Sequence, residues 1–141
     1  MIDLREHAAR SPKERARRLG VAKVVREVAA KQHAEFLLAE AAVIVLGEFG
    51  DEVARIIVQT SPCQISLHGQ AIITEVMDAD DEPIWSALGR GEGAGRLWAG
   101  EGEAAELITQ AWGVSSEAFR PVDEHKGLYE IRLHRAAGAR S

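Results

Sequence analysis

The chain has 141 residues, with 17 Lys and Arg, 22 Asp and Glu, and a single Cys. This length predicts one domain spanning 1–141, and the lone cysteine excludes an intramolecular disulfide and a cysteine-based zinc site. The longest strongly apolar run, residues 36–46, is much shorter than the roughly 20 residues of a membrane-spanning helix. No signal-peptide pattern opens the chain, so we expect a cytoplasmic protein without membrane contact.

The charge is distributed unevenly along the chain. Residues 1–31 carry nine basic and four acidic side chains, a charge of +5, whereas residues 32–141 carry eight basic and 18 acidic side chains, a charge of −10. A basic end on an acidic body can attract a polyanion. It can also dock on the acidic surface of its own or a second chain, and a solvated or self-docked face is the simpler interpretation.

The N-terminal part predicts successive helices. Residues 1–10 are polar, and we expect them to form a frayed tail. The sequence Ser11-Pro12-Lys13-Glu14 is typical of a helix start, with Ser as the N-cap and Pro at the first helical position. We expect this helix to end near Gly20. A second, amphipathic helix should then carry a stripe of valines: Val21, Val24, Val25 and Val28.

A third helix is expected where the chain is most apolar. Residues 36–46 are apolar nearly all round, which indicates burial on most sides, with a strand at 43–46 as the alternative. Asp51 is then a suitable cap for a short helix that would carry Val53, Ile56 and Ile57.

The pattern changes after Pro62. It predicts strands at 64–67, 70–77, 83–88 and 128–134, a glycine-rich loop at 89–102, a helix at 103–112 and a frayed tail at 135–141. The fold class is therefore α+β: a helical N-terminal half followed by a small three- to four-stranded antiparallel sheet with one covering helix.

A helix-turn-helix is the first functional candidate. Ala16-Arg-Arg-Leu-Gly20-Val21 resembles the first helix and turn of that DNA-binding motif. At position 26 the motif has an apolar residue that packs its two helices together, and this chain has an arginine there. The simpler alternative is a helical hairpin with a basic outer face. The resemblance implies DNA contacts from six basic residues: Lys13, Arg15, Arg17, Arg18, Lys23 and Arg26.

The second candidate is an acidic loop between two predicted strands. Its spacing lacks the glycine and the glutamate of a calcium-binding EF-hand, so we expect no metal there. A row of carboxylates suits electrostatic steering toward a basic protein surface. The alternative is a solvated turn that protects the hairpin edge from aggregation. The carboxylates are Asp78, Asp80, Asp81 and Glu82.

The glycine-rich loop is the third candidate. Arg90-Gly-Glu-Gly93-Ala-Gly95 resembles the acetyl-coenzyme A loop of the N-acetyltransferase family, and it follows a predicted strand as that loop does. The resemblance implies a pyrophosphate held by backbone N–H groups. In that family the loop leads directly into a long helix, whereas Gly100 and Gly102 interrupt it here. Acetyl transfer is therefore a distant alternative to a plain connecting loop.

The chain shows no further catalytic pattern. It lacks Gly-x-Ser-x-Gly and His-Glu-x-x-His, and its five histidines have no metal-ligand spacing. Cys63 is interpreted as a small buried hydrophobe. We therefore expect no enzymatic activity, no cofactor and no metal.

Trp98 lies in the glycine-rich loop, where an aromatic side chain either packs into the core or is presented to a partner. We expect Arg96, Leu97 and Trp98 to anchor a protein partner that the acidic loop steers. The sequence thus predicts a small intracellular binding protein, of the accessory, regulatory or inhibitory kind that mobile elements and phages encode. Its N-terminal helices are candidates for a homodimer interface. The alternative is a DNA-binding regulator that uses residues 12–31.

Overall fold

A computed structural model describes residues 2–60, 70–87 and 97–133. Two helices, α1 (Leu4–Ala9) and α2 (Pro12–Phe49), come first. The rest alternates strands with short helical elements: β1 (Val53–Thr60), β2 (Ala71–Asp78), β3 (Pro83–Ser86), α3 (Glu101–Val114), the 3-10 turn η1 (Ser116–Ala118), β4 (Arg120–Asp123), the 3-10 turn η2 (Glu124–Lys126) and β5 (Leu128–Arg132). The predicted α+β class is confirmed.

The sheet has five strands in the order β3-β2-β1-β5-β4, and every neighbouring pair is antiparallel. The sequence predicted β2, β3 and β5 close to their observed bounds, but it missed β4, which has only four residues. Pro121 cannot donate a ladder hydrogen bond, and it is tolerated because β4 lies at the edge of the sheet. The strand expected at 64–67 and the tail at 135–141 lie outside the described residues.

The N-terminal half differs most from expectation, because α2 is one continuous helix of 38 residues. Gly20 lies in its interior, where a glycine costs only about 1 kcal/mol relative to alanine. A Cβ atom added at Gly20 would meet open space, so no close contact requires a glycine there. No turn separates two helices at this point, and the prediction of a helix-turn-helix is wrong.

Two shorter segments also differ from expectation. The helix predicted to follow Asp51 is β1, the central strand, whose apolar residues lie on both faces: Val53, Ile56, Ile57 and Val58. A short apolar run of this kind fits either a strand or a buried helix, and pairing on both sides selects the strand. The stretch expected to be a frayed tail carries α1, which Asp3 caps by accepting hydrogen bonds from the N–H groups of Arg5 and Glu6.

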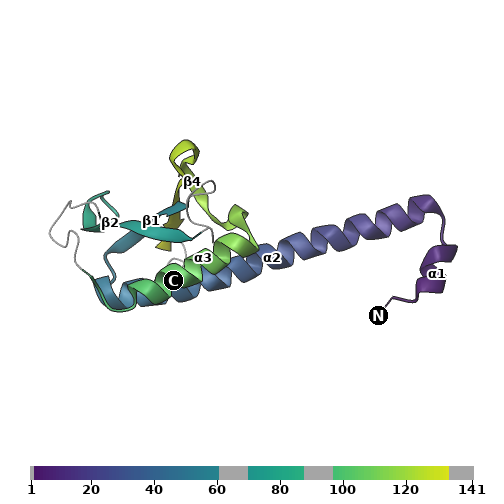
Figure 1. Cartoon of the computed structure of the whole chain (residues 1–141), viewed down its shortest axis with the longest axis horizontal. Helices are drawn as coiled ribbons and strands as arrows, with labels where there is room; N and C mark the ends of the chain where they lie inside the picture. The colour runs from purple at the N-terminus through teal and green to yellow at the C-terminus, as the bar shows by residue number, and fades with distance from the viewer. Residues whose placement is uncertain (1, 61–69, 88–96, 134–141) are drawn as a thin grey trace.

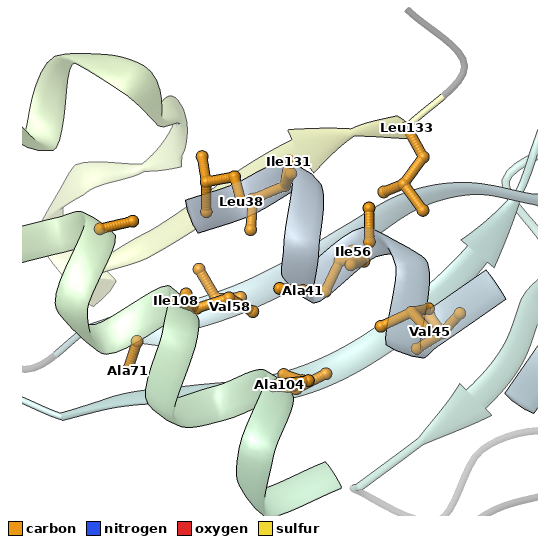
Figure 2. Close-up of a cluster of buried hydrophobic side chains, with 14 of the residues drawn as sticks. Leu38, Ala41, Val45, Ile56, Val58, Ala71, Ala104, Ile108, Ile131 and Leu133 are labelled. Carbon is orange, nitrogen blue, oxygen red and sulfur yellow. The ribbon is translucent and has the colours of Figure 1, made fainter. Parts of the chain in front are cut away.

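The core lies between the sheet and a layer made of α2 and α3, which cover the same face (Figure 1). Leu38 and Val45 of α2 belong to the same buried cluster as Ile56 and Val58 of β1 and Ile131 of β5 (Figure 2). The alanines at the contact between the two helices let their backbones approach closely, and four of them are at most 1% exposed: Ala34, Ala41, Ala104 and Ala111. Only the second half of α2 takes part in this core.

Gly127 lies in the turn directly before β5, and its substitution tests the contact between this turn and Thr60 at the end of β1. Its φ of 70° is a left-handed conformation, and a Cβ atom there would overlap the backbone carbonyl oxygen of Thr60. We expect Gly127→Ala to lower the free energy of unfolding by more than about 1 kcal/mol in urea unfolding. Gly47 lies in α2 beside open space, so the matched variant Gly47→Ala should raise that free energy by up to about 1 kcal/mol. Equal effects at both sites would contradict the described turn.

Candidate protein-binding surface

The first half of α2 extends away from the rest of the molecule (Figure 1). The buried residues of α2 begin at Ala34, and none of residues 12–33 is buried. Glu27 and Ala30 are its first side chains to border the end of α3, where they line a shallow hollow. Residues 12–26 therefore form a free helical arm, which is about 22 Å long at 1.5 Å per residue.

An apolar stripe runs along α2 on the side away from the sheet. Val25 and Val43 each lie nine residues from the buried Ala34, which is 2.5 helical turns, so they face the opposite side of the helix. Phe36 lies near the same line and is 73% exposed. We name these residues the outer stripe, which consists of Val21, Val25, Val28, Phe36 and Val43 together with the exposed Ala29 and Ala39.

The arm has few internal contacts to hold it as a helix. Ser11 accepts a hydrogen bond from the N–H of Glu14, and the Glu14 carboxylate binds Arg17 with oxygen–nitrogen distances of 2.7 and 3.0 Å. This hydrogen bond holds the pKa of Glu14 below its ordinary value. An isolated helix of about 15 residues is marginal in water, and β-branched valines lower its propensity further. A helical arm with exposed valines is therefore typical of a segment that is covered by a partner.

Basic residues surround the arm rather than lining one face. At 100° per residue, Arg15, Arg17 and Arg18 point to three different sides of the helix. The six residues of the predicted DNA contact, Lys13, Arg15, Arg17, Arg18, Lys23 and Arg26, all lie on this arm. The structure thus brings them onto one projecting helix, but it gives them no recognition helix of the predicted kind.

Trp98 is part of the core and is only 7% exposed. Its indole ring packs edge-on against Phe49 at a centroid distance of 5.0 Å and against Trp85 at 6.1 Å. The expected interface anchor is therefore a packing residue that joins the end of α2 to β3. Its neighbour Leu97 is 90% exposed, and Arg96 lies outside the described residues, as does the stretch 90–95 that resembles the acetyl-coenzyme A loop.

The acidic loop is a tight turn held by its own carboxylates. The Asp78 Oδ1 atom accepts hydrogen bonds from the backbone N–H groups of Asp80 and Glu82, both at 2.9 Å. Asp81 has a φ of 64° and pairs with Arg55 of β1 at 2.7 Å. Two of the four carboxylates thus serve the hairpin itself. Asp80 and Glu82 are exposed on the same turn.

Sequence reasoning missed a charged cluster around Glu130. The register places Glu130 of β5 opposite Arg120 of β4, and Arg55 of β1 opposite Arg132 of β5. The Glu130 carboxylate is 5% exposed and binds Arg55 and Arg132, each at 2.8 Å, with Arg120 at 3.5 Å. Burial raises the pKa of Glu130, but the hydrogen bonds from Arg132 and Arg55 outweigh this effect and hold the pKa below its ordinary value. This carboxylate joins three strands.

An open groove of about 670 Å³ separates α2 from β4 and β5. Its lining includes the apolar residues Leu38, Ala42 and Ile131 and equal numbers of acidic and basic residues: Lys31, Arg120, Arg132, Glu35, Glu117 and Glu130. This balance of charge favours neither an anionic nor a cationic ligand. The outer stripe is therefore the better candidate site.

The described residues contain no group of three or more His, Cys, Asp or Glu placed to hold a metal ion. Nor does any helix within them combine the length and the apolar character needed to cross a membrane. Comparison of the chain with protein-family models, with curated proteins and with solved structures finds no match.

The two neighbours Trp98 and Leu97 allow a matched test of the core assignment. We expect Trp98→Ala to destabilise the domain by about 3–5 kcal/mol, because it removes a large buried side chain. Leu97→Ala should change the free energy of unfolding by less than about 0.5 kcal/mol, because that side chain is exposed. Urea unfolding followed by circular dichroism measures both. A folded and fully stable Trp98→Ala chain would contradict the packing of Trp98.

The charged cluster predicts a pH dependence. Because the folded pKa of Glu130 lies below its unfolded value of 4.5, its stabilisation is complete above that pH and is lost as the pH falls toward the folded pKa. We expect Glu130→Gln to cost about 1–3 kcal/mol at pH 7 and to flatten the loss of stability below pH 4.5. Urea unfolding between pH 7 and pH 3 tests this. Parallel curves for both chains would show that Glu130 contributes no such linkage.

Proposed function

We propose that this chain is a non-enzymatic binding protein that acts by protein–protein contact through the outer stripe of α2. The observation that carries the proposal is the free arm, on which Val21, Val25 and Val28 are each more than half exposed. The proposal keeps the predicted mode of action but moves the contact surface. Trp98 is replaced as the anchor by residues that face outward from the helix.

The stripe is large enough to support such a contact. Burial of one valine or phenylalanine side chain contributes about 1.5–3 kcal/mol. The five large residues of the outer stripe therefore offer about 7–15 kcal/mol, which is of the same size as the cost of association, and the apolar side chains of a partner add to it. Long exposed apolar stripes on a soluble chain commonly mark interaction sites.

A DNA-binding regulator remains the second candidate, because the arm is strongly basic. Residues 12–31 carry seven basic and two acidic side chains, and most are exposed. The contact would then be made to phosphates by a single basic helix. Such binding falls steeply between about 50 and 200 mM salt, whereas an apolar contact depends little on salt.

Substitutions on opposite sides of the arm test the proposal. We expect Val25→Asp combined with Val28→Asp to abolish capture of partner protein by the tagged chain from an extract of its source cells. The melting temperature of the domain should stay within about 2 °C, because neither residue is buried. The bound proteins are quantified by mass spectrometry.

The matched control is Ala16→Asp combined with Leu19→Asp, which adds the same two charges nine residues before Val25 and Val28 and thus on the other side of the arm. Partner capture should survive this change. Equal capture by all three chains would refute the outer stripe as a binding surface. Salt-sensitive binding to random duplex DNA that survives the Val25 and Val28 substitutions would favour the regulator instead.

A further inference from the structure

We infer that the outer stripe binds the α2 helix of a second copy of this chain, in antiparallel orientation. The inference rests on the proposed function, since it names the partner of the same surface. It draws on three features of α2: the spacing of its exposed apolar residues, the opposite charge of its two halves, and the position of the rest of the domain on its other side.

The exposed residues follow the spacing of a two-helix seam. The seven positions of this seam are separated by alternating steps of three and four residues, and all are exposed: 22, 25, 29, 32, 36, 39 and 43. In an antiparallel pair centred near residue 34, Val25 lies opposite Val43 of the second copy, and Ala29 lies opposite its Ala39. These two layers join side chains of like size, and the central layer places Gln32 opposite Phe36 of the second copy. Both halves of the stripe are then covered.

The charges of α2 favour the antiparallel orientation. Residues 12–31 have seven basic and two acidic side chains, whereas residues 32–49 have three acidic and no Lys or Arg. A parallel pair would place the two basic halves side by side, where they repel each other. An antiparallel pair places each basic half beside an acidic half. In the register above, Arg26 flanks the seam beside Glu40 of the second copy, and symmetry makes this pair twice.

The domain leaves room for this partner. The sheet and α3 contact the side of α2 that carries Ala34, Leu38 and Val45, and the seam lies on the other side. Each arm would lie along the back of the other copy's domain. The helices would overlap over residues 19–49, which is about 45 Å. Pairing of this kind covers residues 19–26 of each arm, which have no cover in the single chain (Figure 1).

Single cysteines test the orientation in the full-length chain. The native cysteine is removed by Cys63→Ser, and Val25→Cys and Val43→Cys are made in separate chains, one of them tagged. We expect mild oxidation of the mixture to cross-link the two different chains. The Val25→Cys chain alone should form little dimer, because the two positions would lie 18 residues apart along the seam, about 27 Å. Efficient cross-linking of the Val25→Cys chain with itself would overturn the antiparallel orientation.

A charge exchange tests the register. Sedimentation of the unmodified chain should show a concentration-dependent dimer. We expect Arg26→Glu and Glu40→Arg each to weaken dimerisation about five-fold or more, given two symmetric pairs of about 0.5 kcal/mol. The combined variant should return to near the original dissociation constant. Two weakening effects that simply add would overturn the Arg26–Glu40 contact.

The two proposals fail in different ways. A chain that stays monomeric at about 100 μM would overturn the inference of self-association. If the Val25 and Val28 substitutions still abolished partner capture, the outer stripe would remain a binding surface for another protein. If they changed neither capture nor dimerisation, both proposals would fall.

Discussion

The continuity of α2 is the constraint on which the rest of the molecule depends. Its second half supplies the core side of the helical layer, where alanines at 34 and 41 allow α3 to pack closely and Leu38 and Val45 reach the sheet. Because the helix is not interrupted at Gly20, the same rigid element also carries its first half out into solvent. One helix therefore links the folded core to the candidate binding surface.

The strands of the sheet are held together by apolar packing on one face and by a charged cluster on the other. One of its faces is covered by helices, and the other carries a buried carboxylate that binds arginines from β1, β4 and β5. A charge as buried as that of Glu130 is tolerated only with several hydrogen-bonding partners. Asp81 continues this network through Arg55 to the β2–β3 turn. Charged groups that resembled a steering surface in the sequence thus partly serve to hold the strands in register.

The candidate site arises from a mismatch between the length of α2 and the size of the domain. The sheet and α3 cover the helix only from about Glu27 onward, so about 15 residues have no cover within the chain. Exposed valines on such a segment lower the solubility of the chain and the stability of the helix. A partner that buries these valines would remove both effects. The proposal of an antiparallel second copy adds that the two halves of α2 complement each other in charge.

The sequence by itself determined several local elements and the fold class. Period-two alternation identified β5, turn residues bounded β2 and β3, and the alanine and leucine spacing of residues 103–112 identified α3. Ser11 and Pro12 marked the start of α2, because cap chemistry is local. The valine stripe was also visible as an amphipathic face. These features depend on neighbours within a few residues, so a single sequence suffices to predict them.

Only the tertiary structure decided which face each residue shows and where each element ends. Gly20 and Gly47 leave α2 intact because nothing beside them requires a turn, and that depends on what packs nearby. β1 is a strand because β2 and β5 pair with it, although its apolar run also fits a helix. Trp98 is buried by Phe49 and Trp85, which are distant in sequence. The valines in the first half of α2 are exposed because the sheet ends before it reaches them: Val21, Val24, Val25 and Val28. Burial is a property of the assembled layers, and composition and spacing do not encode it residue by residue.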